Sequence, residues 1–169
     1  FFALVIALLL TIAVSAQTRT SVATGNWAAG ATWDCGCIPA PTENVVIASG
    51  HNVSITSNTT INDVTINSGG FLGNTSRFDV NGNYANNGTQ GGSANVRLRG
   101  VGTTISGTGI NSSSGNLTLR DGNKTILAGT NMNKTGGNMR VQSGVTVTNN
   151  GAVTIRNVLT GSATGVWIN

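Results

Sequence analysis

Hydrophobic and polar positions alternate in a short sequence motif that recurs along the chain after residue 44. The motif consists of an apolar residue, any residue, a second apolar residue, one or two polar residues, and then Gly or Asn. Alternation with period two places both apolar side chains on one face of a β-strand, while Gly or Asn permits the positive φ of a sharp corner. The copies are VVIASG from Val45, VTINSG from Val64, FDVNG from Phe78, VRLRG from Val96, LTLRDG from Leu117, MRVQSG from Met139 and VTIRN from Val153.

The starts of these copies are about 18 residues apart on average, which is a repeat signal. Weaker strand-like pieces such as Val53–Ile55 and Val145–Val147 lie between them. A unit of that length with two or three short strands is one coil of a solenoid whose inward pairs stack into Val, Ile and Leu ladders. We therefore predict an all-β fold, a single-stranded right-handed parallel β-helix (β-solenoid), over residues 45–169. We also expect the natural protein to continue beyond Asn169.

An antiparallel β-sandwich is the alternative, because it also has many short strands at similar spacing. Asn-Gly and Asp-Gly dipeptides that could close hairpins occur at Asn81-Gly82, Asn87-Gly88, Asp121-Gly122 and Asn150-Gly151. The strand expected on the far side of such a turn is often missing, as in the segment 81–95, NGNYANNGTQGGSAN. The solenoid is therefore the preferred prediction.

Residues 1–16, FFALVIALLLTIAVSA, form an apolar segment that precedes the repeats. It is short for a bilayer span and ends in small residues where a signal peptidase would cut before Gln17. We predict a signal-peptide helix, and hence a secreted protein, extracellular or on the outer cell surface, with no stable membrane span after cleavage. The alternative is a pilin-like filament subunit. Some mature pilins begin with Phe, but they resemble one another in a longer apolar helix with Glu at position five, where this chain has Val5.

The segment 17–44 is predicted to be an N-terminal cap. A solenoid exposes the apolar interior of its first coil and its sheet edges, and a cap prevents end-to-end association. Trp27 and Trp33 are large enough to cover the ladders, and Pro39 and Pro41 remove backbone donors where strand pairing should stop.

Cys35 and Cys37 lie within this cap segment. A structural zinc site needs four ligands, but the chain offers two cysteines and a single histidine, His51. A redox pair would normally be Cys-x-x-Cys on a thioredoxin-like unit, which is absent from the sequence. In an exported protein the two thiols are candidates for a disulfide within the cap.

The composition predicts a weakly charged, polar surface. Only 8% of the 169 residues are charged and 5% are aromatic, and nine basic residues against five acids give a net charge of +4. No basic run is present, so we expect no nucleic-acid partner.

Catalytic chemistry has few candidates in this sequence. Solenoids that cleave polysaccharides cluster carboxylates on one exposed face, and the acids here are Asp34, Glu43, Asp63, Asp79 and Asp121. The outward position between the apolar pairs predicts a mixed ladder of Val46, Thr65, Asp79, Arg97, Thr118, Arg140 and Thr154. Asp79 beside Arg97 is interpreted as a surface ion pair of little energetic worth, and His51 as structural. We expect no catalytic residue, no cofactor and no metal site.

A family resemblance rests on Trp27, Trp33, Pro39 and the run ENVVIASGHNV at 43–53. With the Asn- and Gly-rich repeats that follow, this opening resembles the N-terminal region of Bacteroidota-type secreted β-helical surface, adhesin-like proteins. It is also similar in outline to the eight-glycine domain of extracellular β-helix proteins. The resemblance implies a cell-surface β-helix, often joined to a C-terminal sorting domain, which this sequence lacks.

The function we expect is a noncatalytic secreted or cell-surface structural and adhesive β-solenoid module. Its expected partners are extracellular polysaccharides or surface glycans. One alternative is the N-terminal part of a polysaccharide-degrading or carbohydrate-binding β-helix protein. Tyr84 is the unassigned aromatic candidate for a sugar platform in that case.

Overall fold

The computed structural model describes residues 16–156, 158–160 and 166–168. Over these residues the protein is all-β, and the one short helical turn is the 3-10 turn η1, Gly30–Thr32. None of the described helices is long and apolar enough to cross a membrane. The predicted signal-peptide helix lies, except for Ala16, outside the described residues.

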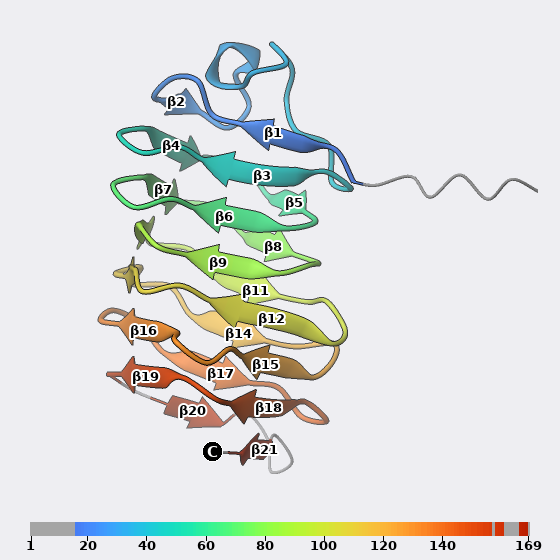
Figure 1. Cartoon of the computed structure of the whole chain (residues 1–169), viewed down its shortest axis with the longest axis vertical. Coiled ribbons are helices and arrows are strands. Elements are labelled where there is room, and N and C mark those ends of the chain that lie inside the picture. Colours follow the sequence, from blue (N-terminus) through green and yellow to red (C-terminus); the bar gives the residue numbers. More distant parts are fainter. Residues whose placement is uncertain (1–15, 157, 161–165, 169) are drawn as a thin grey trace, which may run out of the picture.

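The strands form three parallel sheets, each running the length of the stack (Figure 1). The β3 sheet contains β1 (Thr18–Thr20), β3 (Asn44–Ile47), β6 (Val64–Ile66), β9 (Tyr84–Asn86), β12 (Thr103–Ser106), β15 (Lys124–Ile126), β18 (Thr146–Asn149) and β21 (Val166–Ile168). The β4 sheet contains β2 (Gly25–Asn26), β4 (Asn52–Ile55), β7 (Phe71–Asn74), β10 (Thr89–Gly92), β13 (Ile110–Asn111), β16 (Asn131–Lys134) and β19 (Ala152–Ile155). The β8 sheet contains β5 (Thr59–Ile61), β8 (Phe78–Val80), β11 (Val96–Leu98), β14 (Leu117–Leu119), β17 (Met139–Val141) and β20 (Val158–Thr160).

These sheets confirm the predicted parallel β-solenoid. The chain runs along β3 in front, turns into β4 and returns behind through β5 one level down, which is a right-handed path (Figure 1). The strand pairs of the described residues are parallel, and one isolated antiparallel bridge joins Ser21 and Trp33. At Asn81-Gly82 the preceding strand β8 pairs with β5 and β11, not with β9. The antiparallel sandwich is therefore wrong.

The predicted repeat length was too short because the sequence motif occurs in all three sheets. The copies at Val45 and Val64 lie in the β3 sheet, those at Phe78, Val96, Leu117 and Met139 lie in the β8 sheet, and the copy at Val153 lies in the β4 sheet. The 14-residue steps in the sequence thus skip one intervening strand and pass two corners without completing a coil. Paired residues on neighbouring coils are 18 positions apart at Leu72 and Gln90, and 23 apart at Lys124 and Val147.

Inward side chains form continuous ladders through the stack. In the β8 sheet the inward register runs Ile61, Val80, Leu98, Leu119 and Val141, all of them buried. Each such side chain contributes roughly 1.5–3 kcal/mol on burial. Because neighbouring members come from different coils, this burial stabilises the stacking of coils and not the single coil.

The interior of the middle coils is more polar than the predicted apolar ladders. In the β4 sheet the ladder that begins with Val53 and Leu72 continues as Gln90, Asn111 and Lys134. The three polar members are buried, with exposed fractions of 1% or less. The sequence alternation did not reveal them, because polar residues at inward positions read as outward ones.

Two buried lysines serve as hydrogen-bond donors inside the solenoid. The Lys134 ammonium donates to the carbonyl oxygens of Ser113 (2.6 Å), Gly115 (3.1 Å) and Gly136. Lys124 donates in the same way to Gly100, Arg120 and Gly122. Burial lowers the pKa of both lysines to about 8. Each ammonium therefore supplies hydrogen bonds to three corner carbonyls inside the solenoid.

Gly92 shows how closely the corners of successive coils approach. Its φ is 106°, and a Cβ at this position would overlap the carbonyl oxygen of Asn74 in the coil above. Gly144 also has a positive φ, 79°, but a Cβ there would meet open space. We expect Gly92→Ala to lower the free energy of unfolding by about 3 kcal/mol or more, and Gly144→Ala by about 1–2 kcal/mol. Urea denaturation of the two variants measures the difference, and equal losses would show that backbone strain alone matters.

Candidate functional site

The outer face of the β8 sheet carries a ladder of charged and hydroxyl side chains. Its register runs Thr60, Asp79, Arg97, Thr118 and Arg140, one residue from each successive strand. The sequence predicted Asp79 to Arg140 in this order correctly. It was wrong to add Val46, Thr65 and Thr154, because the first two lie in the β3 sheet and the third lies in the β4 sheet.

Asp79 is the anion around which the arginines of this face are arranged. Its two carboxylate oxygens accept from Nε and a terminal nitrogen of Arg97, both at 2.6 Å. Arg77 and Arg99 lie 3.3 and 3.5 Å from the same carboxylate. Burial alone would raise the pKa of Asp79, but the hydrogen bond and charge of Arg97, with Arg77 and Arg99, hold that pKa below its usual value.

The predicted ion pair between Asp79 and Arg97 is therefore present, but its interpretation as a weak surface pair is wrong. Asp79 is 1% exposed, and Arg97 is 21% exposed at its side chain. An ion pair in that environment is only weakly screened by water and salt. Loss of the Asp79 carboxylate would leave the positive charges of Arg77, Arg97 and Arg99 without an anion between them.

We call the surface made by Arg77, Arg97, Arg99, Arg120 and Arg140 the arginine face. Asp121, at the end of β14, accepts from Arg99 (2.8 Å) and Arg120 (3.0 Å). Five arginines against two aspartates leave this face with a formal charge of +3. The chain as a whole carries +4, so most of its excess charge gathers on one sheet.

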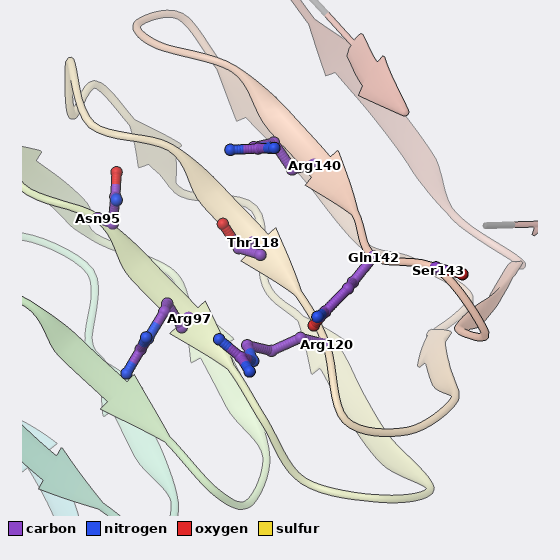
Figure 2. A pocket seen from close by; sticks show the side chains of 7 residues that line it. All are labelled: Asn95, Arg97, Thr118, Arg120, Arg140, Gln142 and Ser143. Atoms are coloured by element: carbon purple, nitrogen blue, oxygen red, sulfur yellow. The ribbon is translucent and has the colours of Figure 1, made fainter. Parts of the chain in front are cut away.

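An open groove of about 430 Å³ lies on the arginine face (Figure 2). Arg97, Arg120 and Arg140 come from three successive strands or their ends, and their side chains border it. The other lining residues are Asn95, Thr118, Gln142 and Ser143. Arg140 is exposed, and its side chain makes no ion pair or hydrogen bond with another described residue. The lining therefore offers guanidinium, amide and hydroxyl groups.

The residues predicted to form the cap lie together at the β1–β2 end of the stack. Trp27 and Trp33 are 3% and 1% exposed, and their rings meet edge to face with centroids 4.9 Å apart. Trp33 Nε1 donates to the Trp27 carbonyl at 2.8 Å, and the Trp27 ring lies against Phe78 of β8. Pro39 is buried and Pro41 is exposed. The segment 17–44 also supplies β1 and β2 to the sheets, so solenoid pairing begins before residue 45.

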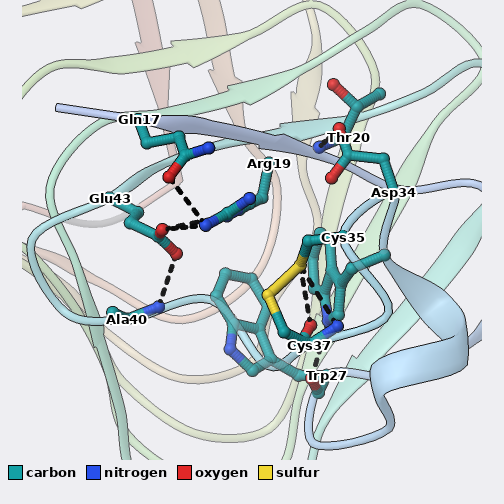
Figure 3. Close-up of a disulfide and its surroundings, with 10 residues drawn as sticks. Gln17, Arg19, Thr20, Trp27, Asp34, Cys35, Cys37, Ala40 and Glu43 are labelled. Carbon is teal, nitrogen blue, oxygen red and sulfur yellow. Dashed lines mark hydrogen bonds and ion pairs between the residues drawn. A yellow bond between two sulfur atoms is a disulfide. The ribbon is translucent and has the colours of Figure 1, made fainter.

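The two cysteines are joined in a disulfide that lies near Trp27 (Figure 3). Cys35 packs against the hydrophobic core, and its Sγ accepts from the Cys37 backbone N–H at 3.1 Å. Nearby, Glu43 accepts from Arg19 (2.9 Å) and from the Ala40 N–H (2.8 Å), which fixes the loop that carries the prolines.

Replacing both cysteines by serine is expected to have a small effect on stability. The disulfide closes a very short loop, so it removes little conformational freedom from the unfolded chain. We expect the free energy of unfolding to fall by about 1–2 kcal/mol. Chemical denaturation with and without a reductant measures this loss, and the serine variant, which should not respond to reductant, is the control.

The remaining carboxylates are separate from one another and each is engaged. Asp63 accepts from the Asn83 N–H at 2.7 Å, and Asp34 accepts from the Thr20 N–H at 3.1 Å. The hydrogen bond from Arg19 lowers the pKa of Glu43. Burial alone would raise the pKa of Asp121, but the hydrogen bonds from Arg99 and Arg120 hold it below its usual value. Among the described residues, no three His, Cys, Asp or Glu side chains gather as metal ligands would. His51 contacts Ser21 through Nδ1 at 3.0 Å.

Tyr84 does not provide the sugar platform considered from the sequence. It is an inward residue of β9, 2% exposed, in register with Val64 and Ile105 of the neighbouring strands. The alternation at Tyr84-Ala85-Asn86 could not show which side faces inward, because Tyr is amphipathic and Ala is small, so that either can lie on the inner or the outer side of a strand.

No protein-family model, no curated protein and no solved structure matches this chain. The β-helical architecture is therefore shown by the strand pairing of the structure alone.

Proposed function

We propose that this chain is a noncatalytic structural and adhesive β-solenoid module of an exported protein, exposed outside the cell. The observation that carries the proposal is a rigid stack of parallel strands that presents one cationic, grooved face along its axis. Such a stack keeps surface groups at fixed intervals, which suits an extended partner better than a small substrate.

The state of the carboxylates supports a noncatalytic role. Polysaccharide hydrolysis uses two carboxyl groups that face a common space, and one of them needs a raised pKa to act as an acid. Asp79, Asp121 and Glu43 instead have lowered pKa values, since each is paired with arginine. These groups are held as permanent anions, which is the state required of ion-pair partners.

The disulfide supports the exported location. Disulfides persist in oxidising compartments, and the chain has no free cysteine beside this pair. An exported β-helix with a tryptophan-rich N-terminal end also fits the Bacteroidota-type surface proteins and the eight-glycine β-helix domain, and we keep membership of such a group as part of the proposal.

A carbohydrate-binding role is the second candidate, and the arginine face favours it. The polysaccharide-degrading alternative would place catalytic groups on further coils of a longer protein. The pilin-like alternative rests on residues 1–16, nearly all of which lie outside the described residues.

Location and activity test the proposal directly. Antibodies against the chain should label intact cells or the culture medium of the source organism, while a cytoplasmic marker is labelled only after lysis. The purified chain should release no reducing ends from pectic, sulfated or neutral polysaccharides. Labelling that appears only after lysis would overturn the exported location, and sugar release lost in the Asp79→Asn variant would overturn the noncatalytic role.

A further inference from the structure

We propose that the groove on the arginine face binds linear acidic polysaccharides through their carboxylate or sulfate groups. This inference rests on the proposed extracellular function and specifies its ligand class. It joins three observations, which are the spacing of the arginines, their free donors and the chemistry of the groups between them.

The spacing suits a linear polymer that lies along the solenoid axis. Arg97 and Arg140 occupy the same register position two strands apart, with Thr118 between them. Neighbouring strands lie about 4.8 Å apart, so the two backbones are separated by roughly 10 Å along the axis. A chain of charged sugars placed along this line meets cationic groups at intervals that the sheet hydrogen bonds fix.

Each arginine that borders the groove retains hydrogen-bond donors. Arg97 gives Nε and one terminal nitrogen to Asp79, and Arg120 gives Nε to Asp121. A guanidinium has five N–H donors, so both residues keep terminal N–H groups for another anion. The aspartates also hold these two side chains in place, which reduces the entropy lost on binding. Arg140 has no such anchor among the described residues, so it supplies an uncompensated charge.

The groups between the arginines are suited to sugar hydroxyls. The lining includes the amides of Asn95 and Gln142 and the hydroxyl of Thr118, and none of the lining residues is aromatic. Neutral sugars usually bind by stacking on aromatic rings, and single-stranded nucleic acids likewise stack their bases on them. A ligand that carries both anionic and hydroxyl groups fits the lining better than either.

The test uses the full chain and two matched arginine variants. Arg140→Gln removes the groove arginine that has no ion-pair partner within the described part of the chain, whereas Arg156→Gln removes an exposed arginine beyond β19, which belongs to the β4 sheet. Thermal unfolding confirms that both variants fold. The probes for affinity electrophoresis are polygalacturonate, dextran sulfate, neutral dextran and double-stranded DNA.

We expect retention by polygalacturonate, dextran sulfate or both, and none by neutral dextran. Arg140→Gln should weaken binding about 5- to 10-fold and make it less sensitive to salt, while Arg156→Gln stays close to the unchanged protein. The probe that binds identifies carboxylate or sulfate as the anion. Equal weakening by the two variants, binding to neutral dextran, or tighter binding to DNA would overturn the inference. Failure here would leave the cellular location, tested separately, unaffected.

Discussion

Asp79→Asn is expected to lower the free energy of unfolding by about 3–5 kcal/mol, because removing one partner of a buried ion pair leaves the other charges uncompensated. The buried carboxylate accepts two 2.6 Å hydrogen bonds from Arg97 and lies near Arg77 and Arg99. The neutral amide keeps the shape but cannot balance these arginines. Urea denaturation at neutral pH measures the loss.

Asp121→Asn is the matched control for this variant. Asp121 also pairs with two arginines, but its side chain is 32% exposed, so water screens the pair. Its φ of 66° is one that Asn adopts readily. We expect a loss below about 1 kcal/mol. Similar losses in the two variants would contradict the central role of Asp79 in the arginine face.

The stability of the protein should fall in acid, with Asp79 as a main contributor. The pKa of Asp79 in the folded protein lies below the value of about 3.9 for an unfolded chain. Its contribution is therefore complete above that pH and is lost as the pH falls through the lower, folded pKa. Unfolding midpoints are measured between pH 6 and pH 2 in steps of about 0.5 pH unit. They should decline less with falling pH for Asp79→Asn than for the unchanged protein.

Trp33→Ala is expected to cost about 3–5 kcal/mol, the usual range for a large aromatic side chain removed from a core. Trp33 is 1% exposed, packs edge to face on Trp27 and donates its indole N–H to the Trp27 carbonyl. Trp33→Phe keeps most of the ring but loses this donor, so it should cost less. Val101→Ala, at a side chain 80% exposed, should change stability by less than about 0.5 kcal/mol and serves as the control.

The same variant tests the role of the N-terminal segment as a cap. Without the Trp33 ring, apolar surface and sheet edge at the β1–β2 end become accessible to a second molecule. We expect Trp33→Ala to form larger species with rising concentration in light scattering under conditions that keep it folded. A folded variant that stays the same size as the unchanged protein would contradict the cap.

The fold class could be predicted from the sequence because strand alternation and corner residues are local signals. Pairs such as Val64 and Ile66 with a glycine after them indicate a strand and a turn whichever sheet they join. The coil length could not be predicted in this way. The same motif occurs in all three sheets. The number of residues between successive motifs therefore sometimes spans part of a coil and sometimes a whole coil.

The candidate site was predictable only in part. The order Asp79, Arg97, Thr118 and Arg140 followed from the repeat, because those four copies lie in one sheet. Arg99 and Arg120 were missed, since they follow their strands at corners and only the stacked coils bring them to the same face. That Asp79 is buried among three arginines also required the structure.

The sequence by itself determined that this chain forms short strands with sharp corners and carries few, mostly positive, charges. Only the tertiary structure decided which strands are neighbours, and with them the buried lysines, the inward Tyr84 and the groove lined by Arg97, Arg120 and Arg140. The physical reason is that each of these features depends on contacts between residues about twenty positions apart. Such contacts arise from the stacking of coils, which the alternation within one strand does not encode.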